Sequence, residues 1–258
     1  MRPADHSETA SWLARNGLAD AEPTPLLTAR LAARRRARLA DSMLLAAFLI
    51  GAALTHGLRL TVDSPAWLSL VLLAALVAGL LVAQWLLGWW VRRADRRAGA
   101  SLSQRAAHPV ELGWPAVLGR PLAVFTVASF TAAVLLAVSV LPVPDADLRF
   151  GAVVVLISLA GAGTGTVLQL RQVLAGPAVA EDEASLTADV IMRVEDARAL
   201  VTPSLVWSLP AIFLYGESLG WWNAVALALV VAGAIVFCLI QIRAAGVGPT
   251  ARRALATR

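Results

Sequence analysis

Hydrophobic residues along this chain fall into six long runs that contain no charged side chain. The runs cover residues 42–58, 64–91, 121–144, 150–170, 199–216 and 218–242. A helix that rises about 1.5 Å per residue needs roughly 20 residues to cross a hydrocarbon core about 30 Å thick. The pattern therefore predicts an all-α polytopic membrane protein with six transmembrane helices.

The segments between the runs are polar and define the expected organisation of the chain. The predicted parts are a cytoplasmic N-terminal segment at 1–40 with a basic amphipathic helix, a membrane domain at 41–243 with cytoplasmic loops 92–120 and 171–198, and a cytoplasmic tail at 244–258. Hydrophobic residues make up 59% of the chain, against roughly 45–50% in soluble domains, which agrees with a chain that lies mostly in lipid.

The arginines indicate the orientation of the helices. All 22 basic residues are arginine, which we interpret as the coding bias of a GC-rich bacterial genome. Seven precede the first run, six lie in loop 92–120, three lie in loop 171–198 and four follow the last run, whereas the alternate loops hold only Arg59 and Arg149. Because Arg and Lys gather in cytoplasmic loops, both termini are predicted to lie inside, at the bacterial cytoplasmic membrane. Tryptophans at the ends of the runs agree with an aromatic belt: Trp67, Trp221 and Trp222 at outer ends, Trp89, Trp90 and Trp114 at inner ends.

A basic helix is predicted directly before the first run. Thr24 and Pro25 are typical of an N-cap and a first helical position. Such a helix is expected to lie on an anionic leaflet, where arginines are attracted to lipid phosphates. The alternative is a cytosolic extension of the first span. The expected anionic-lipid contacts are Arg30, Arg34, Arg38, Arg92 and Arg96.

A second amphipathic helix is predicted in loop 171–198, and it is acidic. Leu186, Val190 and Val194 recur at helical spacing and form one apolar stripe, while Asp189 and Arg193 are expected on a more polar, exposed face. Anionic lipid would repel this stretch, so the stripe is expected to pack against protein. That protein is either the same chain or a partner, which makes these three residues a candidate partner-docking helix.

The stretch LAGAGTGTVLQLRQ, at residues 159–172, is rich in glycine but does not predict a phosphate-binding loop. It lies within an apolar run and lacks the Gly-Lys-Ser/Thr ending of a P-loop. Gly161 and Gly165 form a small-xxx-small pair that lets two helix backbones approach closely in lipid. They are predicted to be helix-packing residues, with a substrate-lining helix as the alternative. The same face also fits a homo-oligomer.

The run at 199–216 contains two prolines with structural consequences. Pro203 is expected near the start of the helix, whereas Pro210 would break its hydrogen bonds one to two turns later. A simple kink is the first interpretation. A segment that lines or gates a pathway is the alternative, because membranes tolerate broken helices beside a cavity.

Side chains typical of catalysis or metal binding are sparse. The only cysteine is Cys238, and the three histidines lie in different segments. Asp182, Asp189 and Asp196 recur seven apart, so about 10 Å separates neighbours, too far for shared metal ligands. No charged side chain lies near the middle of a run, where ion and proton pathways place them. We expect no catalytic, metal or cofactor-binding residues and no nucleic-acid partner, and hence a non-enzymatic protein.

These observations favour a multi-pass membrane subunit that docks a cytoplasmic partner, an ATPase or a regulator, in a bilayer containing anionic lipids. The layout of a basic surface helix, six spans and a sizeable 92–120 loop is similar to that of ABC-2-type permeases. This similarity of arrangement implies the alternative function, a permease subunit of an ATP-driven exporter. The turn around Glu217 is shorter than the re-entrant element that those permeases carry before their last span.

Overall fold

Helices make up all of the regular secondary structure in the part of the chain that the computed structural model describes, namely residues 3–61, 66–100, 113–176, 183–202, 220–244 and 246–256. The helices are α1 (Pro3–Arg15), α2 (Pro25–Thr61), α3 (Ala66–Ala100), α4 (Trp114–Leu118), α5 (Arg120–Val140), α6 (Ala146–Ala175), α7 (Glu183–Val201), α9 (Gly220–Arg243) and α10 (Val247–Ala256). Most of the expected span at 199–216, with Pro203 and Pro210, lies outside the described residues.

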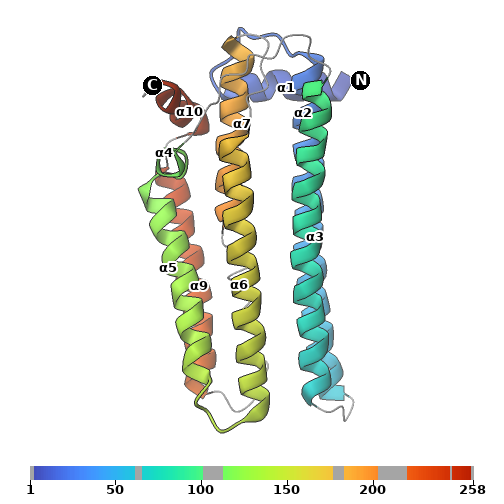
Figure 1. The fold of residues 1–258 in the computed structure, drawn as a ribbon, viewed down its shortest axis with the longest axis vertical. Coiled ribbons are helices and arrows are strands. Elements are labelled where there is room, and N and C mark those ends of the chain that lie inside the picture. The colour runs from blue at the N-terminus through green and yellow to red at the C-terminus, as the bar shows by residue number, and fades with distance from the viewer. Residues whose placement is uncertain are drawn as a thin grey trace.

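Five of these helices are long and apolar enough to cross a membrane. The candidate spans are Pro25–Thr55, Trp67–Arg97, Arg120–Val140, Leu148–Ala175 and Trp221–Arg243. Figure 1 shows the long helices side by side, with both chain termini at the same end of the bundle. The prediction of a helical membrane architecture is confirmed to this extent. The sixth span and the inside–outside orientation stay predictions.

Helix α2 runs without interruption from the basic segment into the first apolar run. The Leu27 N–H donates to Thr24 Oγ1 at 3.2 Å, so Thr24 caps the helix as expected. The basic segment is therefore continuous with the first long apolar helix and does not form a separate helix; its placement in the cytosol or at an anionic leaflet stays a prediction. The physical reason is that no glycine or proline follows Pro25 until Gly51, so nothing ends the helix between the two segments.

Buried apolar side chains form two clusters at different heights of the bundle. One lies between the apolar parts of the long helices and includes Val77 of α3, Ala137 of α5 and Val155 of α6. The other gathers near the termini around α7 and takes residues from α1, α2, α4, α5, α6 and α10. We call this end the cap, meaning α1, α4, α7 and α10 with residues 25–41 of α2 and 92–100 of α3.

The long helices direct most of their apolar side chains outward. Only 6% of the apolar window of α9 is buried within the protein, and the largest share for any of the five helices is 33% in α5. Ile50 of α2, Ile157 of α6 and Ile235 of α9 are each more than half exposed. Large exposed apolar surfaces of this kind are rare on soluble monomers, which is why a hydrocarbon environment suits this fold.

Candidate functional site: a buried arginine–aspartate network

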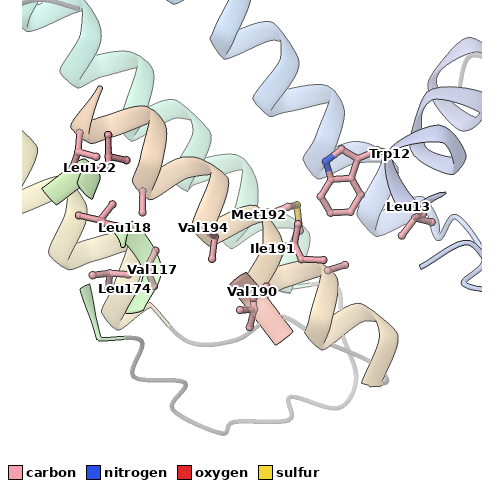
Figure 2. Close-up of a cluster of buried hydrophobic side chains, with 14 of the residues drawn as sticks. Trp12, Leu13, Val117, Leu118, Leu122, Leu174, Val190, Ile191, Met192 and Val194 are labelled. Carbon is pink, nitrogen blue, oxygen red and sulfur yellow. The ribbon is translucent and has the colours of Figure 1, made fainter. Parts of the chain in front are cut away.

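Helix α7 is buried in the middle of the cap, because it packs against α4, α5, α6 and α10. Val190 and Val194 have no exposed surface, and Leu186 packs against the same apolar cluster. Figure 2 shows members of this cluster arranged along α7, from Trp12 and Leu13 at one end to Leu118 and Leu122 at the other. The stripe through Leu186, Val190 and Val194 is therefore covered by the chain itself, and a partner would have to meet another surface of the cap.

A charged contact joins the first two long helices beside this cluster. Arg34 of α2 donates from Nη1 to Asp95 Oδ1 at 2.9 Å and from Nη2 to Asp95 Oδ2 at 2.8 Å. Arg30, one turn earlier on the same face, donates from Nε to Asp95 Oδ1 at 3.1 Å. This two-pronged geometry suits a planar guanidinium and a carboxylate. Asp95 of α3 thus holds two arginines of α2.

The same two arginines reach α7. Arg30 Nη2 donates to Asp189 Oδ1 at 2.5 Å, and Arg34 Nε donates to Asp196 Oδ2 at 2.9 Å. Within α7, Arg193 Nε donates to Asp189 Oδ2 at 2.8 Å, and its Nη1 donates to the Gly176 carbonyl at 2.6 Å. Asp189 and Asp196 lie two turns apart on α7, whereas their partners Arg30 and Arg34 lie one turn apart on α2. The network therefore ties α2, α3 and α7 together.

The arginines and Asp189 of the network are buried, Asp95 and Asp196 are partly exposed, and the formal charges of the network cancel. Its members are Arg30, Arg34, Arg193, Asp95, Asp189 and Asp196, three cations and three anions. The side chains of Arg30 and Arg34 are each 5% exposed, and that of Asp189 is 1% exposed. Burying charges costs several kcal/mol per ion unless each finds partners of good geometry. Here every carboxylate accepts from a guanidinium, and removing Asp189 would leave the buried Arg193 without a carboxylate partner in the network.

A second set of polar contacts attaches α1 and α10 to α7. Trp12 Nε1 donates to Glu195 Oε1 at 3.0 Å, and Arg198 Nη2 donates to Thr250 Oγ1 at 3.0 Å. Burial lowers the pKa of the Arg198 guanidinium, since desolvation disfavours its charged form. These bonds complete a cap in which α7 is the central element.

The positions of Arg30 and Arg34 correct the expectation that they contact anionic lipid. Both guanidinium groups face carboxylates inside the cap and leave little surface for a phosphate. Asp189 and Arg193, expected on an exposed polar face, are buried as well. The sequence did contain a signal for this pairing. Arg30 and Arg34 lie four residues apart on α2, and Asp189 and Asp196 lie seven residues apart on α7, so each helix has a charged face of opposite sign. Asp95, the only acid among the arginines of 92–97, was the residue that sequence reasoning missed.

The other arginines expected at the lipid surface remain accessible. Arg38 is 58% exposed and lies 3.7 Å from Glu195 Oε2. Arg96 is exposed on α3, and its Nε donates to the Arg92 carbonyl at 3.4 Å. Their contact with anionic lipid stays a prediction.

The two glycines expected to pack helices differ in their surroundings. A Cβ added at Gly161 would lie 3.4 Å from Leu81 Cδ1 of α3, in tight contact. A Cβ added at Gly165 would meet no atom of the described residues within 4 Å. Gly161 thus faces a neighbouring helix, whereas Gly165 faces none in the described part of the chain.

Within the described ranges, no three His, Cys, Asp or Glu residues are placed to hold a metal ion. The arrangement can couple three helices but offers no unpaired nucleophile or base inside the network. Comparisons with protein-family models, with curated proteins and with solved structures found no match to this chain.

Proposed function

We propose that this chain is a non-enzymatic, multi-pass subunit of the bacterial cytoplasmic membrane, and that its cap docks a soluble cytoplasmic partner. The observation that carries the proposal is the buried network, which holds α2, α3 and α7 together as one preassembled unit. When a surface is already ordered before a partner binds, less of the binding free energy is lost to ordering it. A preassembled cap on five apolar helices is suited to present such a surface.

The placement in the bilayer is supported by exposed tryptophans at the two ends of the apolar helices. Trp67 and Trp221 are each 59% exposed near the end opposite the termini, and Trp89, Trp90 and Trp114 are exposed near the cap. Arg93 lies 5.1 Å from the Trp89 ring, a cation–π distance. Exposed aromatic rings are typical of membrane–water interfaces, and the arginine-rich cap then faces the cytoplasm.

A sixth crossing is part of the proposal and is supported by contacts at both ends of α5. Thr126 Oγ1 donates to the Val201 carbonyl at 3.0 Å, and Trp222 Nε1 donates to Ser139 Oγ at 3.1 Å. Thr126 and Ser139 are about 20 Å apart along α5 at the rise of an α-helix. Val201 and Trp222, which flank the connection from Thr202 to Gly220, therefore contact α5 at two heights about 20 Å apart. This difference is a large part of the thickness of a hydrocarbon core.

Purification from native membranes in a gentle detergent tests the docking role. The wild-type chain should carry one soluble protein at a constant ratio, measured by quantitative mass spectrometry. Asp189→Ala, which opens the network, should lose that protein while still inserting, and Glu183→Ala, at an exposed position of the same helix, should keep it. Absence of any soluble protein at a constant ratio would overturn the docking role. A co-purifying ATPase would favour the permease of an exporter, and a regulator or enzyme would favour the docking subunit.

A further inference from the structure

A groove of about 310 Å³ lies between α1 and the cap part of α2, beside the network but separate from it. Trp12, Leu31 and Ala32 supply its apolar lining, and Trp12 is only 7% exposed. Its charged lining residues are Asp5, Glu8, Arg15, Arg35 and Arg38. No residue of the buried network lines the groove.

Charges of both signs line this groove. Helix α1 supplies the acids Asp5 and Glu8 and the cation Arg15 at its last residue, whereas α2 supplies Arg35 and Arg38. Arg35 pairs with Glu8, and the two side chains are 56% and 50% exposed, so water competes strongly for both. The Arg38 Nη1 to Glu195 Oε2 distance of 3.7 Å is longer than a hydrogen bond. A ligand that brings one anion and one cation would satisfy both walls of the groove.

The height of the groove places it at lipid headgroups. Ser42 begins the first charge-free run, and Arg38 and Arg35 precede it by about 6 Å and about 10 Å along α2. A headgroup layer is roughly 5 to 8 Å thick on each side of the hydrocarbon core. Arginine side chains of this length reach along a helix toward that layer. Arg38 therefore lies at the level of the headgroup layer, and Arg35, which lies just beyond that layer, reaches toward it through its long side chain.

We propose that the groove binds the headgroup of a phosphoethanolamine lipid. The phosphate would accept hydrogen bonds from Arg35 and Arg38, and the ammonium would donate to Glu8 and Asp5. A purely anionic headgroup would face two carboxylates without a cation to offer them. A choline headgroup carries no N–H to donate, so it would leave those carboxylates without hydrogen bonds. The inference rests on the proposed membrane placement, with the cap at the bilayer surface.

Native mass spectrometry of the full-length protein in detergent tests this inference. The titrants are phosphatidylethanolamine, phosphatidylcholine and phosphatidylglycerol with identical acyl chains. Phosphatidylethanolamine should bind roughly tenfold more tightly than the other two, the difference expected for about one charge-assisted hydrogen bond. Equal binding of the three lipids, or tighter binding of phosphatidylglycerol, would overturn the proposal.

Two substitutions locate the site. Glu8→Gln should remove the preference for ethanolamine over choline, and Arg38→Gln should weaken both lipids by a similar factor. Glu22→Gln, an exposed acid outside the groove, is the matched control and should change neither. If Glu8→Gln still prefers ethanolamine over choline, the headgroup inference is wrong, but the proposed membrane placement is not affected. A wild-type chain that leaves membranes without detergent contradicts the membrane placement itself, so the two failures are distinguishable.

Discussion

Arg34 of α2 holds Asp95 of α3 with two parallel hydrogen bonds, at 2.9 Å and 2.8 Å, and the same guanidinium reaches Asp196 of α7 at 2.9 Å. One side chain thus joins three helices whose contact residues are 61 and 162 positions away in the chain. Because a guanidinium is planar and presents its donors in a fixed fork, this contact defines the relative position of the helices more strictly than apolar packing alone.

Replacing Arg34 by lysine keeps the positive charge but removes the planar guanidinium that donates two parallel hydrogen bonds. A double-mutant cycle of Arg34→Lys with Asp95→Asn should give a coupling free energy of about 2 kcal/mol, because a buried, charge-assisted pair is lost. Unfolding followed by tryptophan fluorescence in detergent measures it. The same cycle on Arg35 and Glu8, an exposed pair, should show almost no coupling. Equal coupling in the two cycles would contradict the structural role of the network.

Removing the Asp189 carboxylate should destabilise the protein strongly. Asp189→Ala leaves Arg30 and Arg193 without one of their partners at buried positions. Breaking a buried pair from one side costs about 3 to 5 kcal/mol. Glu183→Ala removes an exposed acid from the same helix and should leave the melting temperature nearly unchanged. A small effect of both substitutions would mean that Asp189 is hydrated in solution.

A charge placed in the stripe of α7 tests the apolar side of the same helix. Val194→Asp buries a carboxylate in the apolar cluster around α7, at a cost of a few kcal/mol. Ala199→Asp adds the same charge at an exposed position of α7 and is the control. Thermal unfolding in detergent should separate the two clearly. If both variants melt like the wild type, α7 does not form the centre of the cap.

The two glycines of the small-residue face should respond differently to leucine. Gly161→Leu pushes a side chain against Leu81 and should lower stability by about 1 to 3 kcal/mol. Gly165→Leu meets no atom of the described residues within 4 Å of its Cβ and should leave the packing of those residues unaffected. Thermostability measures the first effect, and size-exclusion chromatography with light scattering reports the oligomer. If Gly165→Leu instead dissociates an oligomer, its face packs against a second copy of the chain.

Labelling of single cysteines tests the orientation. In a Cys238→Ala background, Pro144→Cys lies in the exposed turn between α5 and α6 and Ala19→Cys lies in the cap. An impermeant maleimide should modify Pro144→Cys in whole cells and Ala19→Cys only after permeabilisation, because the arginine-rich cap is expected inside. Modification of Ala19→Cys in intact cells would invert the topology.

The sequence alone determined that this protein is helical and carries spans long enough for a membrane. Run length and absence of charge are local properties, so the runs at 42–58 and 150–170 reappear within α2 and α6, and the run at 64–91 reappears in α3 from Ala66 onward. The N-cap at Thr24 was likewise readable, since a cap depends on residues three apart. Local spacing also identified the apolar stripe of α7, although not what covers it.

Only the tertiary structure decided where the charges of the cap go. Arg30 and Arg34 have the same helical spacing whether their face meets lipid phosphates or carboxylates of a distant helix. Asp189 lies 159 positions after Arg30, and nothing within either helix specifies that pairing. It becomes favourable only once α7 packs between α4, α6 and α10 and excludes water from both charges, because buried ions need each other as partners.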